Sequence, residues 1–295
     1  MRTPTTRTKR LANLFMSSID SSWSSAGSLK TVTSHASIVS GEANRPSSRI
    51  NRLDVNQSTK IGLAAFECLR LSAQIYEETN GAFDITIGPL LKCWLNHDKT
   101  PRVPSEEEIK RALQQTGQNL LQLDENQHSV KVQTRVHVDL GGIGKGYAVD
   151  QLVKLLRDWE IDTALIHGGA SSVYALGAPP ETKGWPLTLS VPGNQKQTLA
   201  RLYMRDRSLS GSGVQKGQHI IDPRTGQPVK GNCAAWACAS GAASADALST
   251  AFMMMTPDEV EKYCARNRDV AAMIVTGESN EGEAEISHFG RWDER

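Results

Sequence analysis

A glycine-rich segment at residues 138–150, VDLGGIGKGYAVD, most constrains the fold of this chain. Apolar residues alternate over residues 136–140, which predicts a strand, and recur at helical spacing over residues 149–156, which predicts a helix. A helix that begins after glycines presents unpaired N–H groups and the positive end of its dipole, and the missing Cβ atoms let a phosphate or a metal ion approach the backbone. The segment therefore predicts a turn that can bind an anion or a metal ion.

Neither of two common phosphate-binding motifs fits this segment. A G-x-G-x-x-G fingerprint that starts at Gly142 needs a glycine where the chain has Tyr147. A P-loop needs Ser or Thr after its lysine, and Lys145 is followed by Gly146. Taken alone, the segment could also be a tight turn without a ligand.

Charge and cysteine content exclude several classes of protein. The formal net charge is +1, whereas nucleic-acid-binding proteins usually carry a strong basic excess. The five cysteines form no CxxC pair, which argues against a disulfide framework and a zinc ribbon and favours a reducing compartment. No apolar run has the length of a transmembrane helix, and residues 11–16 are too short for the core of a secretory signal. We expect a cytoplasmic protein without a nucleic-acid partner or a transmembrane segment.

Residues 1–45 differ in composition from the rest of the chain. They are rich in Ser, Thr and basic residues, and Asp20 is the only acid before Glu42. This composition predicts a disordered leader, and the alternative is a transit peptide that would place the protein in an organelle matrix. The remaining residues, 46–295, are enough to bury a core and are expected to form the folded domain.

Helix and strand patterns alternate irregularly over residues 46–295, which predicts an α+β fold. Helices are expected over residues 58–81, over 105–117 after a capping box at Ser105, from Gly146 onward, and over 243–255. Strands are expected at residues 120–123, 130–133, 136–140, 164–166, 173–176, 234–239 and 270–275, with further short strands after Leu187.

Five motifs, in this order, resemble those of the ApbE family, whose members are FAD:protein FMN transferases. They are GAFD (81–84) with Gly88–Pro89, DLGGIGKG (139–146), Gly168–Gly169, HIIDP (219–223) and ADALST (245–250). The resemblance covers about residues 47–276 and implies an ApbE-like, T-fold-related fold of mixed sheets with packed helices. It implies a Mg²⁺-dependent enzyme that splits FAD, attaches FMN through a phosphoester to Thr or Ser of a target flavoprotein, and releases AMP. The target would carry an Asp-x-x-Ser/Thr-x-Thr segment.

Asp246 and Thr250 are the candidate metal ligands. They lie four residues apart in an expected helix, hence on one face, and their oxygens suit Mg²⁺. The alternative is a solvent-facing Asp beside a surface Thr, although apolar neighbours would make an unpaired carboxylate costly. The resemblance adds the main-chain carbonyl of Gly142 as a third ligand. If Gly142 is purely structural, we expect it to supply a positive φ.

The resemblance also implies that the FAD site is lined by Ala82, Phe83, Asp84, Asp139 and Lys145. A cation at a helix N-terminus, such as Lys145, is disfavoured by the dipole unless an anion lies beside it, which supports a bound phosphate. The chain departs from the family pattern in three ways. Residues 1–45 lack a Met-Gly-Thr-like strand, Ala170 stands where Asp or Asn usually follows the Gly–Gly pair, and Ser210–Gly211 stands where Thr-Ser-Gly is commoner.

His219 is the candidate for proton transfer or for positioning the pyrophosphate. The resemblance implies that this position is needed for activity, and an imidazole can relay a proton at neutral pH. The alternative is a strand histidine that is hydrogen-bonded to the turn at Asp222. Two other functions stay open: a protein that binds FAD without converting it, and an FAD pyrophosphatase in which water replaces the acceptor hydroxyl.

Overall fold

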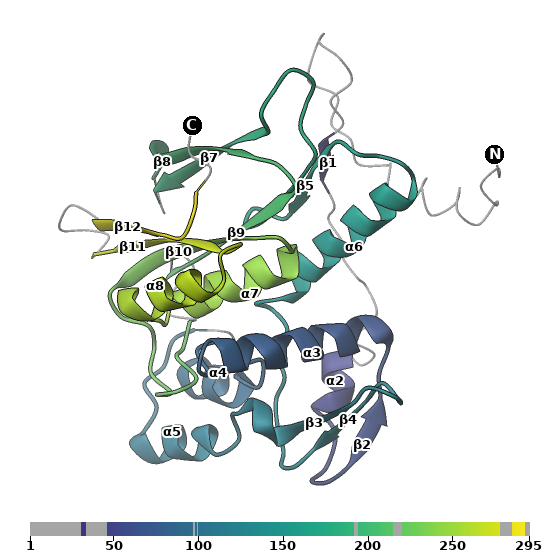
Figure 1. The fold of residues 1–295 in the computed structure, drawn as a ribbon. Helices are drawn as coiled ribbons and strands as arrows, with labels where there is room; N and C mark the ends of the chain where they lie inside the picture. The colour runs from purple at the N-terminus through teal and green to yellow at the C-terminus, as the bar shows by residue number, and fades with distance from the viewer. Residues whose placement is uncertain are drawn as a thin grey trace.

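The computed structural model describes residues 31–33, 46–96, 98, 100–191, 194–214, 220–277 and 285–292. Within these ranges the chain forms a mixed fold of sheets and helices, so the α+β prediction is confirmed (Figure 1). No helix in the described ranges is long and apolar enough to cross a membrane. The five cysteines, which all lie in the described part, form no disulfide among themselves.

A seven-stranded sheet with the order β1-β5-β6-β9-β10-β11-β12 is the centre of the fold. The strand pair β1–β5 is parallel and the other neighbouring pairs are antiparallel. The strands are β1 (Thr31–Thr33), β5 (Ala164–Gly168), β6 (Ser172–Leu176), β9 (Arg207–Gly213), β10 (Asn232–Ala239), β11 (Ala271–Thr276) and β12 (Glu285–Phe289).

Different elements cover the two faces of this sheet (Figure 1). On one face lie α6 (Gly144–Asp158), α7 (Ala242–Phe252) and α8 (Pro257–Arg266). On the other face the hairpin of β7 (Trp185–Val191) and β8 (Asn194–Met204) packs its apolar side chains against β6, β9 and β11. The helix α7 is buried along nearly its whole length, because its many alanines allow a close approach to β9 and β10.

The N-terminal part of the described domain packs against α7 from the side opposite the large sheet. The helix α3 (Leu63–Glu78) contacts α7 and joins it to a small sheet of β2 (Ser58–Lys60), β4 (Ser129–Val132) and β3 (Leu121–Asp124). The other helices here are α2 (Pro46–Ile50), α4 (Gly88–Trp94) and α5 (Glu106–Leu113). Ser105 and Glu108 form the expected capping box at the start of α5.

Two predictions about local structure need correction. The helix expected from residue 58 begins at Leu63, because residues 58–60 pair with β4. Residues 136–140 form no strand: Val138 bonds the side chain of Asn51, and the Asp139 N–H bonds Ile85, so the backbone has local partners instead of a ladder. Thr31–Thr33, within the expected leader, form β1, and the rest of residues 1–45 lies outside the described residues.

Candidate functional site

The N-terminal ends of α6 and α7 touch because Gly146 has no side chain. A Cβ atom at this position would lie 2.1 Å from the main-chain oxygen of Ala242. One turn further along α6, the Asp150 carboxylate accepts hydrogen bonds from the N–H groups of Ala242 and Ala243, at 2.7 and 2.8 Å. It thereby caps α7 from a neighbouring helix. This contact brings Lys145 and Gly146 against Asp246.

Asp246 is a buried carboxylate with several donors around it. The Lys145 ammonium lies 3.0 Å from its Oδ1 and 3.2 Å from its Oδ2, and the Gly146 N–H donates to Oδ2 at 3.1 Å. The Ser172 hydroxyl lies 3.4 Å from Oδ1. Burial raises the pKa of Asp246, while the lysine charge and these hydrogen bonds act in the opposite direction. The site therefore places a buried carboxylate, paired with Lys145, at the meeting point of two helices.

The ion pair with Asp246 identifies the anion that offsets the unfavourable position of Lys145 at the start of α6. The anion beside Lys145 is the Asp246 carboxylate, so the position of the lysine does not by itself indicate a phosphate. The Asp246 side chain is only 3% exposed, whereas that of Lys145 is 44% exposed and its ammonium also donates to the Gly141 carbonyl at 3.1 Å. The same pair shows that a buried carboxylate here has a protein partner and does not require a metal ion.

Thr250 lies one turn after Asp246 in α7, as the spacing predicted. Its hydroxyl oxygen lies 3.3 Å from the main-chain oxygen of Asp246 and 3.1 Å from the Ser212 hydroxyl oxygen. Ser212, on β9, also lies 2.9 Å from the hydroxyl oxygen of Ser249. Asp246 and Thr250 thus share one end of a polar layer between α7 and the sheet.

Gly142 belongs to the same neighbourhood. A Cβ atom there would lie 3.1 Å from the Phe83 ring and 3.4 Å from the Thr250 hydroxyl oxygen. Its φ is outside the left-handed region, so the expectation that it supplies a positive φ is wrong. Close approach, and not backbone conformation, is what this glycine permits.

The other residues expected at the FAD site occupy two kinds of environment. Ala82, Phe83 and Asp84 are buried in the core, and Asp84 accepts 2.7 Å hydrogen bonds from the N–H and hydroxyl of Thr86. Burial raises the pKa of Asp84, which these bonds oppose. Asp139 is exposed, and its carboxylate accepts the Gly141 N–H at 2.7 Å. Phe83 and Lys145 adjoin the Asp246–Thr250 group, whereas Asp84 and Asp139 shape the turns on either side.

Sequence reasoning missed four polar residues of the site, and it singled out one that the structure does not describe. The missed residues are Asp150, Ser172, Ser212 and Ser249. The alternation of serines over residues 208–212 was a usable signal, because buried serines in a strand need partners. His219 lies outside the described residues.

The donor set fits a hard divalent cation. The described residues contain no group of three His, Cys, Asp or Glu side chains that could hold a metal ion. A cation here would instead take one carboxylate together with hydroxyl and carbonyl oxygens, which is the chemistry that Mg²⁺ accepts with water as its other ligands. Asp246, Thr250 and Gly142 offer those three kinds of oxygen.

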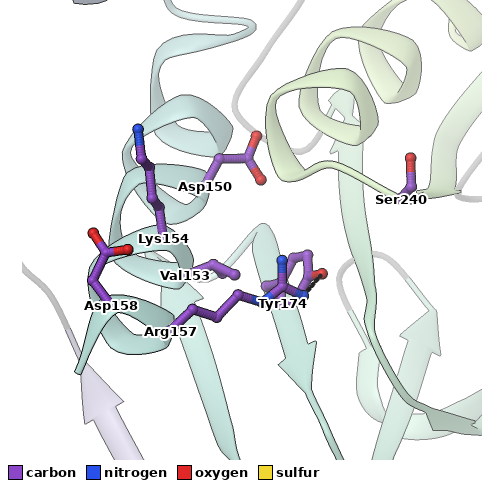
Figure 2. A pocket seen from close by; sticks show the side chains of 7 residues that line it. All are labelled: Asp150, Val153, Lys154, Arg157, Asp158, Tyr174 and Ser240. Atoms are coloured by element: carbon purple, nitrogen blue, oxygen red, sulfur yellow. Dashed lines mark hydrogen bonds between the residues drawn. The ribbon is translucent and has the colours of Figure 1, made fainter. Parts of the chain in front are cut away.

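A cavity of about 330 Å³ lies beside α6, and Asp150 is the one residue of the site described above that lines it (Figure 2). It is lined by Asp150, Val153, Lys154, Arg157, Asp158, Tyr174 and Ser240. The lining contains two acidic and two basic side chains, so their formal charges cancel. The Arg157 guanidinium donates a hydrogen bond to the Tyr174 hydroxyl at 3.4 Å. None of the predicted site residues lines it.

Comparisons with known proteins agree on one family. The ApbE family profile matches residues 32–274. The FAD:protein FMN transferase of Escherichia coli K12 is 28% identical over 233 residues. The aligned region covers 74% of this chain and 66% of that relative, which is just under two thirds of its length. The crystal structure of the apo flavinyl transferase ApbE from Pseudomonas stutzeri has a TM-score of 0.74 at 25% identity and covers 84% of this chain and 79% of that one. The ApbE protein from Thermotoga maritima has a TM-score of 0.72 at 29% identity, with coverages of 82% and 81%.

Proposed function

The chain belongs to the ApbE family, and from this we propose that it is a FAD:protein FMN transferase that requires Mg²⁺. The observation that carries the proposal is the gathering of Asp246, Thr250 and Gly142 beside Lys145. The names of its relatives support the transferase activity, and the oxygen donors of this group support the choice of metal.

Mg²⁺ would be held by the Asp246 carboxylate, the Thr250 hydroxyl and the Gly142 carbonyl. Bound there, it would supply the positive charge that offsets the negative charge of the FAD pyrophosphate. The buried position of Asp246 strengthens its attraction for a cation, since little water screens the carboxylate.

Lys145 is the candidate for pairing with the pyrophosphate of FAD. Its side chain is about half exposed, so its ammonium can turn from Asp246 toward a ligand without leaving solvent. Phe83, which lies against Gly142, would form an apolar wall of the site. Asp139 and Asp84 would hold the turns that carry these residues, and Ala82 would fill the core behind them.

The reaction joins the hydroxyl oxygen of the acceptor Thr or Ser to the FMN phosphorus. The bond from that phosphorus to the bridging oxygen breaks, and AMP leaves with the electron pair. His219 would take the proton of the acceptor hydroxyl. The acceptor would lie in an Asp-x-x-Ser/Thr-x-Thr segment of a target flavoprotein, and cytoplasmic location stays a prediction.

The products distinguish this activity from the two alternatives. We would incubate the protein with FAD, Mg²⁺ and a target that carries the acceptor segment, and analyse the target and the nucleotides by mass spectrometry. Target bearing FMN together with an equal amount of AMP supports the transferase. FMN and AMP in solution with unmodified target would indicate a pyrophosphatase, and FAD that is bound but intact would indicate a binding protein.

A further inference from the structure

Three hydroxyl groups between β9 and α7 form a continuous chain of hydrogen bonds. The Ser249 hydroxyl donates to the main-chain oxygen of Asp246 at 2.9 Å. The Ser212 hydroxyl lies 2.9 Å from that of Ser249 and 3.1 Å from that of Thr250. Ser249 is fully buried, so its bonds have no competition from water.

The number of protons and the contact distances together favour one direction for this chain. Each hydroxyl has one proton to donate, and a carbonyl oxygen can only accept. Ser249 donates to the Asp246 carbonyl, so Ser212 is the donor in its bond to Ser249. The Thr250 hydroxyl could donate to the Asp246 carbonyl at 3.3 Å or to Ser212 at 3.1 Å, and donation to the closer Ser212 lets all three protons use the shortest contacts.

We propose that Ser212 is a positioning residue for the Thr250 hydroxyl. By accepting the Thr250 proton, it leaves both lone pairs of the Thr250 oxygen available to a divalent cation on the Asp246 side of the layer. Without Ser212, the Thr250 hydroxyl would donate its proton to the Asp246 carbonyl at 3.3 Å. The hydroxyl would then be rotated toward the preceding turn of α7, and its lone pairs would point in other directions. The inference rests on the proposed function only in taking Thr250 as a ligand of the cation.

The fold supplies Ser212 through the alternation of β9. Ser210 pairs with Ser172, whose hydroxyl contacts Asp246, so this face of the strand points at α7. Ser212 is two residues further along the same face and pairs with Ala235, a small residue that lets α7 approach. The Ser210 hydroxyl is buried and has no hydrogen-bond partner among the described residues. A buried hydroxyl without a partner is unfavourable, so the polar character of this layer is not explained by packing alone.

The test is the affinity of the metal-free protein for Mg²⁺, measured by isothermal titration calorimetry. Loss of a group that orients a metal ligand typically costs 10- to 100-fold in affinity, so we expect Ser212→Ala to bind Mg²⁺ about 10- to 100-fold more weakly than the wild type. Ser212→Thr keeps an acceptor hydroxyl and should restore most of the affinity. Thr250→Val should abolish binding.

Ser208→Ala is the matched control, because Ser208 lies on the same strand face but donates to Val173 at 2.8 Å, away from Thr250. It should bind Mg²⁺ like the wild type. Wild-type affinity in Ser212→Ala, or equal losses in Ser212→Ala and Ser208→Ala, would overturn the inference, as would a wild-type protein that binds no Mg²⁺. If Ser212→Ala does not fold, Ser212→Thr and Ser212→Cys decide, because a thiol is a poor acceptor and should lose affinity where threonine keeps it.

Failure of the transferase proposal would look different. A wild type that binds Mg²⁺ through Thr250 and Ser212 but transfers no FMN would refute the activity and leave the positioning role intact.

Discussion

Replacing Gly146 with alanine should push α6 and α7 apart at the place where they carry the site. The new Cβ atom would lie 2.1 Å from the Ala242 carbonyl oxygen and 2.7 Å from the Cα atom of Ala243. Both neighbours are backbone atoms of a buried helix, so no side chain can rotate away. Contact at normal distance requires the two helices to separate by about 1 Å, and the Gly146 N–H then withdraws from Asp246.

The size of the effect follows from two opposing terms. Overpacking of a close-packed interior costs about 1–3 kcal/mol, and a clash between two backbones belongs at the upper end. Alanine in a helix recovers about 1 kcal/mol relative to glycine. The net loss is about 2 kcal/mol, which corresponds to a fall of about 4–8 °C in Tm for a domain of this size. A displacement of about 1 Å among reacting groups can also cost about 100-fold in rate.

Gly144→Ala is the control, because it lies in the same helix and a Cβ atom there would meet nothing within 4 Å. Thermal melting and FMN transfer should be measured on both variants. We expect Gly144→Ala to keep the wild-type Tm or exceed it slightly with full activity, while Gly146→Ala loses both. Equal Tm values and equal activities in the two variants would refute the reasoning that α6 and α7 depend on this contact.

Three further substitutions test individual residues of the site. Asp246→Asn should abolish the increase in Tm that Mg²⁺ causes. Burial raises the pKa of Asp246 in the folded chain, so ionisation of this group costs the wild type stability as pH rises. Without metal, the Tm of Asp246→Asn minus that of the wild type should therefore be smallest below the ordinary pKa of 3.8 and grow toward neutral pH. A difference that shrinks with rising pH would contradict this. Lys145→Gln should lower the stability of the metal-free protein by about 1–2 kcal/mol. This is less than the loss expected for a fully buried ion pair, because Lys145 is half exposed. Added Mg²⁺ should raise the Tm of this variant more than it raises the Tm of the wild type. His219→Ala should slow the chemical step by about 100-fold with near wild-type affinity for FAD, and a large loss of affinity with unchanged turnover would make it a binding residue instead.

Local signals in the sequence predicted local structure well. The capping box at Ser105 and the four-residue spacing of Asp246 and Thr250 depend on neighbours within one or two turns, and the structure has both features. The helix α8 was missed although Thr256 and Glu259 form the same kind of capping box, so that signal was present but not used.

Long-range partners could not be read from the sequence. Lys145 and Asp246 are 101 residues apart, and only the packing of α6 on α7 shows that the lysine neutralises this carboxylate. The strand expected over residues 136–140 failed for a similar reason, since Asn51, 87 residues before Val138, takes up the hydrogen bonds that a neighbouring strand would have made. An alternating apolar pattern indicates which side chains are buried, but not which groups pair with the backbone.

The central claim is that Asp246 and Thr250 serve a metal-dependent transfer of FMN, and the Mg²⁺ dependence of that transfer tests it most directly. The wild type, Asp246→Asn and Thr250→Val should be incubated with FAD and the acceptor target over a range of Mg²⁺ concentrations, and the mass of the target followed with time. We expect FMN on the target only with the wild type and only when Mg²⁺ is present. Transfer by the wild type in EDTA, or the same Mg²⁺ dependence in all three proteins, would contradict the account.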